Sequence, residues 1–167
     1  MRTAITLILS NFPLSFLILG FVLGLIAYAR APKGPGALVE ALFAYYLLSA
    51  LGFSYLYNFV MHVFFQSIAA GYIGWAPSPF ETEVGFASLG FAVVALLAFK
   101  GSYGLRVGAV VGPSLFLWGA AGGHVVQMIT AHNFAPGNAG VIFWMDIIVP
   151  LIGFLFLYLQ RGRRQAA

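Results

Sequence analysis

The basic residues of this chain gather at the ends of long apolar stretches. The clusters are Arg30 with Lys33, Lys100 with Arg106, and Arg161 with Arg163 and Arg164, together seven of the eight Lys and Arg residues. Two lengths of membrane fit between successive clusters, because a helix rises about 1.5 Å per residue and the hydrocarbon core is about 30 Å thick. We therefore expect all three clusters on one side of a membrane, and the positive-inside rule favours the cytoplasm.

The composition supports an integral membrane protein. Hydrophobic residues make up 62% of the chain and charged residues 7%, which leaves too little polar surface to cover a water-soluble globule. The stretches are apolar on every face, so they predict helices and not the alternating strands of a β-barrel. The net charge of +4 comes from residues that flank spans, so it does not indicate a nucleic-acid partner. The absence of cysteine excludes disulfides and thiolate metal sites.

The sequence predicts an all-α bundle of five transmembrane helices in a single domain, residues 1–167. The expected spans cover residues 4–29, 38–66, 80–99, 107–131 and 141–159. The first run is much longer than the apolar core of about 7–15 residues in a signal peptide, so we expect a retained span. After residue 66 the chain should continue as an interfacial segment to Gly74. This topology puts the N-terminus outside and the C-terminus in the cytoplasm.

Glycines repeat at four-residue spacing in several of the expected spans. They are Gly20 and Gly24, then Gly104, Gly108 and Gly112, then Gly119 and Gly123. Small residues four apart let another helix approach closely. We expect these stripes to pack within the chain, while a homo-oligomer or a larger membrane complex stays open.

The expected topology draws most ionisable groups toward the outer side. The residues concerned are His62, Glu81, Glu83, His124, His132 and Asp146. Glu40 is the exception, and we expect it to pair with Arg30, Lys33 or Arg106 at the cytoplasmic side. Ionisable groups inside a membrane are costly and are therefore functional candidates. The sequence predicts a polar pocket that opens to the outside.

The candidate ligand-binding residues are His62, Glu83, His124, Gln127 and Asp146. Gln127 follows His124 by three residues and shares its helix face. Glu81 and Glu83 are two apart and face different sides, and we expect Glu83 to face the bundle. His124 is either a ligand or proton acceptor, or a core histidine bonded to Asp146 or Glu83.

Two cofactor alternatives stay open beside the absence of any cofactor. Glu83, His124 and Asp146 offer nitrogen and oxygen ligands for zinc, iron or manganese. His62 and His124 lie at similar depth on different helices, an arrangement that holds haem iron between two imidazoles. The chain has no tight ligand motif such as His-Glu-x-x-His.

Two segments resemble a known group of proteins. One is Ile73-Gly-Trp-Ala-Pro-Ser-Pro-Phe-Glu-Thr-Glu-Val-Gly85, and the other runs from Gly123-His-Val-Val-Gln-Met to Asp146. They resemble a family of small bacterial integral membrane proteins of unknown function, loosely similar to DoxX-type proteins. The resemblance implies a multi-pass protein of the bacterial inner membrane and no assigned reaction. Some DoxX-like relatives are subunits of quinone-linked respiratory complexes.

Three functions are compatible with these features. The first is a non-enzymatic accessory or assembly subunit of a membrane complex, with a structural outer cluster. The second is a binding or transport protein for a small ligand or ion that enters from outside, and the third is a metal or haem redox protein. The chain shows no nucleophile motif and no phosphate-binding loop, which favours the first.

Overall fold

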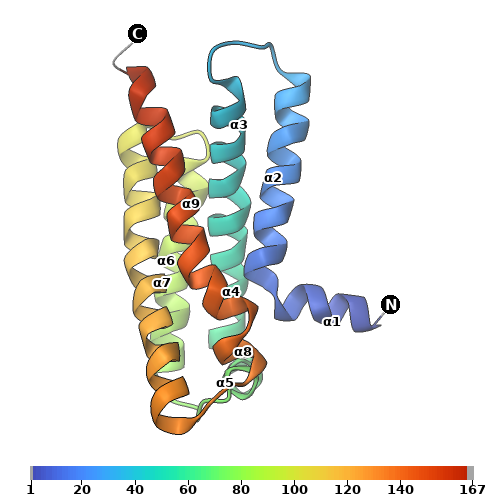
Figure 1. Ribbon diagram of the computed structural model, residues 1–167, viewed down its shortest axis with the longest axis vertical. Helices are drawn as coiled ribbons and strands as arrows, with labels where there is room; N and C mark the ends of the chain where they lie inside the picture. Colours follow the sequence, from blue (N-terminus) through green and yellow to red (C-terminus); the bar gives the residue numbers. More distant parts are fainter. Residues whose placement is uncertain (1, 165–167) are drawn as a thin grey trace.

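The apolar stretches form a bundle of long helices. The computed structural model describes residues 2–164, with the side chains of residues 4–161. Within this part of the chain all regular secondary structure is helical, and five helices are long and apolar enough to cross a membrane. The all-α prediction is thereby confirmed. Figure 1 shows the long helices side by side.

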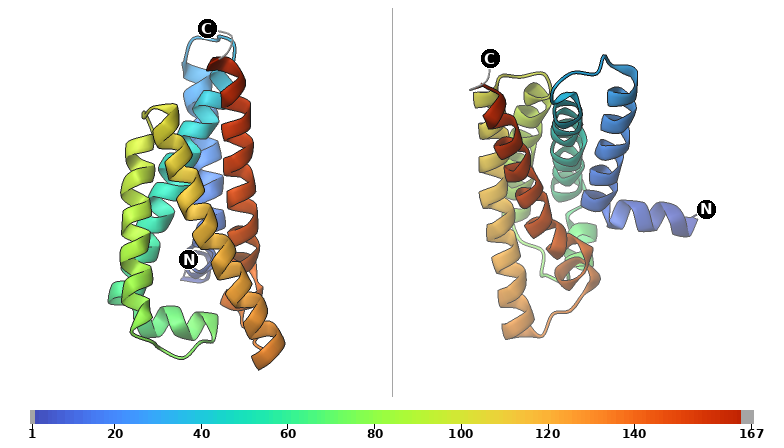
Figure 2. Two further views of the ribbon diagram at one scale, coloured as in Figure 1. Left: turned by 90° about the vertical axis from the view of Figure 1, so that its left-hand side faces the viewer. Right: turned by 45° about the horizontal axis from the view of Figure 1, so that its top comes forward.

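The helices are α1 (Arg2–Ser10), α2 (Phe12–Arg30), α3 (Ala37–Tyr45), the π-helix η1 (Tyr46–Phe53), α4 (Ser54–Phe64), α5 (Gln66–Ile73), α6 (Phe80–Ala98), α7 (Tyr103–Ala131), α8 (Pro136–Ala139) and α9 (Val141–Arg164). α3, η1 and α4 continue one another as a single crossing. The short helices α5 and α8 lie together at one end of the bundle, where α5 runs across the long axis (Figure 2).

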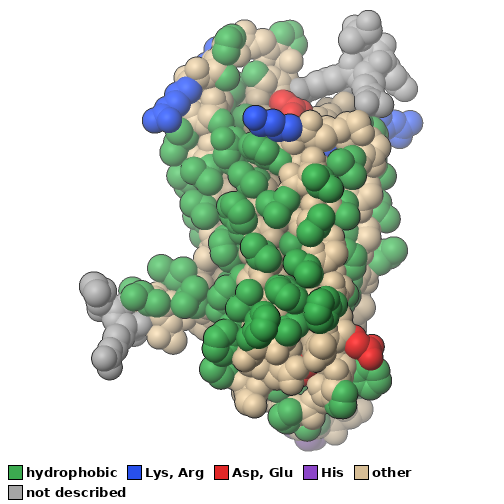
Figure 3. Space-filling model, turned by 180° about the vertical axis from the view of Figure 1, so that it is seen from behind, with side chains coloured by type: hydrophobic (Ala, Val, Ile, Leu, Met, Phe, Trp, Pro, Cys, Tyr) green, Lys and Arg blue, Asp and Glu red, His purple; other side chains and the backbone are tan. Residues whose placement is uncertain are grey.

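The two ends of the bundle differ in charge. The basic end carries Arg30, Lys33, Lys100, Arg106 and Arg161, and the histidine end carries His62, Glu81, Glu83, His124, His132 and Asp146. Figure 3 shows Lys and Arg side chains at one end and histidine at the other. The predicted sorting of charges between the two ends of the helices is thus present in the structure.

The first apolar run is broken, which corrects the expected helix over residues 4–29. α1 leaves the bundle sideways (Figure 1), because Asn11 departs from helical geometry at φ −114°, ψ 36°. Pro13 lacks the N–H that would bond to the carbonyl of Leu9, which weakens the helix at this point. The Asn11 amide donates instead to the Leu7 carbonyl at 2.9 Å. α2 alone, 19 residues long, spans about 28 Å, close to the hydrocarbon thickness.

The second crossing ends where the sequence predicts an interfacial segment. α4 stops at Phe64, and Phe65 has the non-helical angles φ −130°, ψ 37°. α5 then runs across the histidine end (Figure 2). It terminates at Gly74, whose φ of 76° is a left-handed conformation that glycine adopts without strain. The chain is thereby returned over the end of the bundle to α6.

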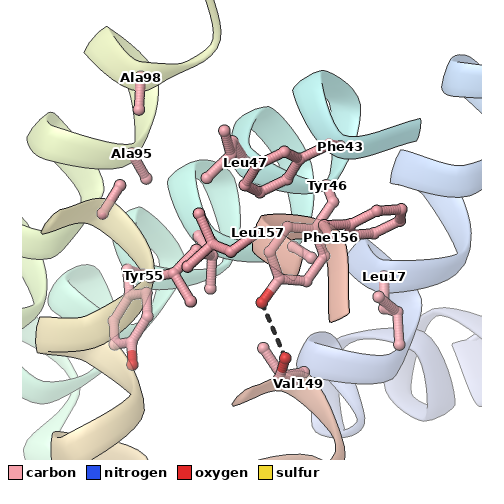
Figure 4. Close-up of a cluster of buried hydrophobic side chains, with 14 of the residues drawn as sticks. Leu17, Phe43, Tyr46, Leu47, Tyr55, Ala95, Ala98, Val149, Phe156 and Leu157 are labelled. Carbon is pink, nitrogen blue, oxygen red and sulfur yellow. Dashed lines mark hydrogen bonds between the residues drawn. The ribbon is translucent and has the colours of Figure 1, made fainter. Parts of the chain in front are cut away.

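Aliphatic and aromatic side chains together fill the middle of the bundle, as Figure 4 shows. The ring of Phe156 stacks on Phe43 with centroids 5.3 Å apart. The Tyr46 hydroxyl donates to the Val149 carbonyl at 2.8 Å. Gly153 makes room for this contact, since a Cβ there would lie 2.8 Å from the tyrosine oxygen. The core therefore ties the α3–α4 crossing to α9.

The glycine stripes divide into inward and outward positions. A Cβ at Gly20 would lie 2.8 Å from the Tyr45 carbonyl oxygen, and one at Gly24 would lie 3.1 Å from Leu42 Cα. These two glycines pack α2 against α3, as expected. The expectation of internal packing is wrong for Gly104, Gly108 and Gly119, where an added Cβ meets nothing within 4 Å. They lie on the outward face of α7.

This division gives a test of the fold. We expect Gly20→Leu to lower the midpoint of thermal unfolding in detergent, because backbone on the neighbouring helix cannot move aside; overpacking of this kind costs about 1–3 kcal/mol. Gly104→Leu is the matched control and should leave the midpoint unchanged or raise it, since leucine favours the helix. Equal midpoints for the two variants would contradict the packing of α2 against α3.

Candidate functional site

Asn138 organises the polar groups at the histidine end. It is fully buried and belongs to α8, which Pro136 begins. Its Nδ2 donates to the carbonyls of His124 at 3.2 Å and Asn133 at 2.9 Å. Its Oδ1 accepts from Trp75 Nε1 at 2.9 Å and lies 2.7 Å from His124 Nδ1. One side chain thus joins α7, α8 and the loop after α5.

These contacts determine where the proton of the imidazole lies. Because both Asn138 donors point to carbonyls, its oxygen must accept from His124 Nδ1, which therefore carries hydrogen. The opposite nitrogen, Nε2, lies 3.5 Å from Asp146 Oδ2. The imidazole and the carboxyl group therefore face each other between α7 and α9.

His124 and Asp146 are both buried. His124 and Asp146 are each 5% exposed, and an unpaired ion in such a place would be strongly disfavoured. The Trp75 ring covers His124 with ring centroids 5.4 Å apart. A Cβ added to Gly123, beside His124 in the chain, would lie 3.5 Å from that indole, an ordinary van der Waals contact. The contact of His124 with Asp146, one of the alternatives left open by the sequence, is present and joins α7 to α9.

A second layer holds the short helices over this cluster. The Asn133 amide donates to the carbonyls of Ile73 at 3.0 Å and Gly74 at 3.2 Å. Gly137 packs so closely on Tyr72 that a Cβ would lie 2.7 Å from its carbonyl oxygen. These contacts clamp the end of α5 to α8. The polar cluster is therefore covered by the chain itself.

A separate polar seam joins α4 and the first residue of α5 to α6. His62 Nδ1 pairs with the Glu81 carboxylate, and both side chains are largely buried. The seam also contains the hydrogen bonds of Gln66 Nε2 to Thr82 Oγ1 and of Asn58 Nδ2 to Ser88 Oγ, each 2.9 Å. His62 therefore has a partner on the neighbouring helix that the sequence analysis did not assign to it.

The expectation that Glu83 faces the bundle is wrong. Glu81 is buried and Glu83 exposed. Gly85 marks the side of α6 that packs on α4, since a Cβ there would contact Val63. Glu81 is four residues before Gly85 and shares that side, whereas Glu83 is two residues away and points elsewhere. Helical period decides the orientation, and proximity to the apolar run does not.

The level of the seam follows from a contact near the end of α2. The rings of Phe12 and Tyr57 lie 4.8 Å apart, so Tyr57 marks the height at which α2 begins. His62 lies five residues further along α4, about 7 Å beyond that height. The His62–Glu81 pair thus sits past the end of α2, where the polar headgroups replace hydrocarbon if α2 just spans the core.

The structure does not assemble the metal or haem arrangements considered from the sequence. Among the described residues no group of three or more His, Asp or Glu side chains is placed to hold a metal ion, and exposed Glu83 is not with His124 and Asp146. Both ring nitrogens of His124 face protein partners, while His62 faces Glu81. The two imidazoles therefore serve different helix pairs.

The remaining polar residues of this end have simpler places. Gln127 is half-buried one turn beyond His124, and its carbonyl accepts the backbone N–H groups of His132 and Asn133. His132 ends α7 in a left-handed conformation, φ 50°. Asn138 was not among the residues that the sequence indicated as candidates. The sequence feature that could have indicated it is Pro136, because a proline at the first helical position predicts a short helix that contains Asn138.

At the basic end, the predicted pairing of Glu40 is found with Arg106. Arg106 Nη1 and Nη2 donate to the two carboxylate oxygens at 2.7 and 2.6 Å. Arg106 also donates to the carbonyls of Ala98 and Phe99, where α6 ends with unpaired acceptors. The ion pair links α3 to α7.

The chain was compared with known proteins. The profile of one family, described as a family of unknown function (DUF6790), matches residues 10–166. No curated protein and no solved structure matches the chain.

The central place of Asn138 leads to a stability prediction. Asn138→Ala removes the partner of two N–H donors and two carbonyls, and we expect a loss of about 3 kcal/mol in the free energy of unfolding. Thr130→Val is the control, since this exposed hydroxyl bonds only to the Val126 carbonyl of its own helix; we expect a change within about 0.5 kcal/mol. Denaturant titration in mixed micelles measures both, and similar losses would refute the role of Asn138.

Proposed function

We propose that the chain, which belongs to this family of unknown function (DUF6790), is a non-enzymatic accessory or assembly subunit of a membrane complex. The observation that carries the proposal is the closed state of the polar cluster. The four hydrogen-bonding positions of Asn138 are all directed at protein atoms. We therefore interpret the cluster as structural: it connects the helices through His124, Asp146 and Trp75.

The outward face of α7 is the surface that we propose for the partner. Gly104, Gly108, Gly119 and Gly122 lie on it, and a Cβ added to any of them meets nothing within 4 Å. At about 100° per residue they fall within a stripe of about 60°. Leu115, 64% exposed, projects from the middle of the stripe. Small residues flanking a projecting side chain fit a second transmembrane helix, because the helix backbones can approach closely.

We also propose the orientation of the chain. The basic end faces the cytoplasm, since Lys and Arg are retained on that side during insertion. The histidine end then faces outward, in the inner membrane of a bacterium. The sorting of charges between the two ends supports this orientation (Figure 3).

The α7 surface leads to an association prediction. We expect the tagged full chain, extracted in mild detergent, to migrate as a complex heavier than the 18.0 kDa chain with its micelle. The double variant Gly108→Leu with Gly119→Leu should reduce the complex at least about tenfold, because bulk on this face separates the helices. Native electrophoresis with mass spectrometry measures the ratio of complex to free chain.

Gly90→Leu is the matched control for this experiment. Gly90 is also an outward glycine with nothing within 4 Å, but it belongs to α6, so its complex should persist. A wild-type chain that is monomeric throughout would refute the accessory role. A complex that contains only copies of this chain would support the α7 surface as an interface, but it would contradict the accessory role and indicate self-association.

The orientation can be tested with single cysteines, because the chain contains none. Gly34→Cys lies in the loop between α2 and α3, and Ala76→Cys lies in the exposed loop before α6. We expect an impermeant maleimide to label Ala76→Cys in intact cells and Gly34→Cys only after the inner membrane is opened. Labelling of both in intact cells would overturn the proposed sidedness.

A further inference from the structure

The basic end carries an open hollow that the accessory role does not use. It has a volume of about 750 Å³ and lies between α3, the turn from α6 to α7, and the end of α9. Glu40, Lys100, Ser102, Arg106 and Gln160 contribute polar groups to its wall. The hollow therefore combines charge and hydrogen-bonding groups at the level where the helices end.

The charges in the wall leave a net positive site. Glu40 is neutralised by Arg106, which is 4% exposed and held in place by two carboxylate bonds and two backbone carbonyls. Lys100 is exposed at the same wall. Two positive groups and one negative group sum to +1 within the hollow. A basic pocket between helices on the cytoplasmic side is the kind of site that binds anionic lipid headgroups.

The neutral groups add a second requirement on the ligand. The Ser102 oxygen accepts the backbone N–H of Leu105 at 3.3 Å, which leaves its hydroxyl hydrogen free to donate. Gln160 Nε2 donates to Glu40 Oε2 at 2.6 Å. Gln160 Oε1 is buried and has no hydrogen-bond partner, the one such buried side-chain atom in the described part of the chain. A ligand for this wall must therefore bring a donor as well as a negative charge.

We propose that the hollow binds a glycerol phosphate group, presented as the headgroup of an anionic phospholipid of the phosphatidylglycerol type. Its phosphate would lie at Lys100 and Ser102, and a glycerol hydroxyl would donate to Gln160 Oε1. A phosphodiester without hydroxyls satisfies the charge and leaves the amide oxygen unpaired. The proposal depends on the geometry of the basic end and is independent of the accessory role and of its partner.

Native mass spectrometry of the purified full chain tests this site. Phosphatidylglycerol is compared with phosphatidylmethanol, which has the same charge and no hydroxyl, and with zwitterionic phosphatidylcholine. We expect phosphatidylglycerol to bind best and Lys100→Gln to weaken its binding about fivefold. Gln160→Leu should abolish the preference for phosphatidylglycerol over phosphatidylmethanol. Lys33→Gln removes a charge from the same end outside the hollow, and binding should be unchanged.

Each result bears on the proposal. Equal weakening by Lys33→Gln and Lys100→Gln, or equal binding of phosphatidylcholine, would overturn it. Retention of the hydroxyl preference in Gln160→Leu would overturn the role of the orphan oxygen. If free glycerol phosphate at equal concentration displaces the lipid, the site stands with the soluble compound as its ligand; persistence of the lipid assigns the lipid. Unchanged circular dichroism of each variant confirms that the bundle is folded.

Discussion

The ionisable side chains that this bundle buries are paired across helices, and its packing depends on this constraint. Within the described residues, Arg106 joins α7 to α3, Glu81 joins α6 to α4, and His124 with Asp146 joins α7 to α9. An isolated charge would be expelled from an apolar medium, whereas a pair of matched charge is retained. Each pair therefore links one helix to a particular neighbour.

The sequence was sufficient for the features that depend on local composition. Length and hydropathy predict five helices that can cross a membrane, and the positions of Lys and Arg sort the two ends of the bundle. The exit of the second crossing near Gln66 was also predictable, because an apolar run of that length exceeds one bilayer. The pairing of Glu40 with Arg106 was among three alternatives. Its selection requires the packing of α3 on α7, which no local pattern encodes.

The failures come from features that depend on direction around a helix. The sequence shows that Glu81 and Glu83 face different sides of α6, but only the structure shows that Gly85 marks the face toward α4, and Glu81 shares that face through the helical period. The same limit applies to the glycines of α7, whose spacing resembles that of Gly20 and Gly24 although most of them point outward. The central role of Asn138 depends on a chain reversal that brings α8 beneath Trp75. The spacing of residues in the sequence shows which of them share a helix face, but only the tertiary structure shows what that face contacts.

The two ends of the molecule solve the problem of buried polarity in opposite ways. At the histidine end, Asn138 and Asn133 direct their amides at backbone carbonyls, so α5 and α8 close over the contact between His124 and Asp146. At the basic end, the Arg106 pair is equally well satisfied, but the wall of the adjoining hollow contains exposed Lys100 and Gln160, whose buried side-chain oxygen has no hydrogen-bond partner. A buried acceptor without a partner is disfavoured unless something outside the chain supplies the hydrogen. The basic end is therefore the part of this fold that is suited to bind a ligand, whereas the polar groups of the histidine end hold the helices together.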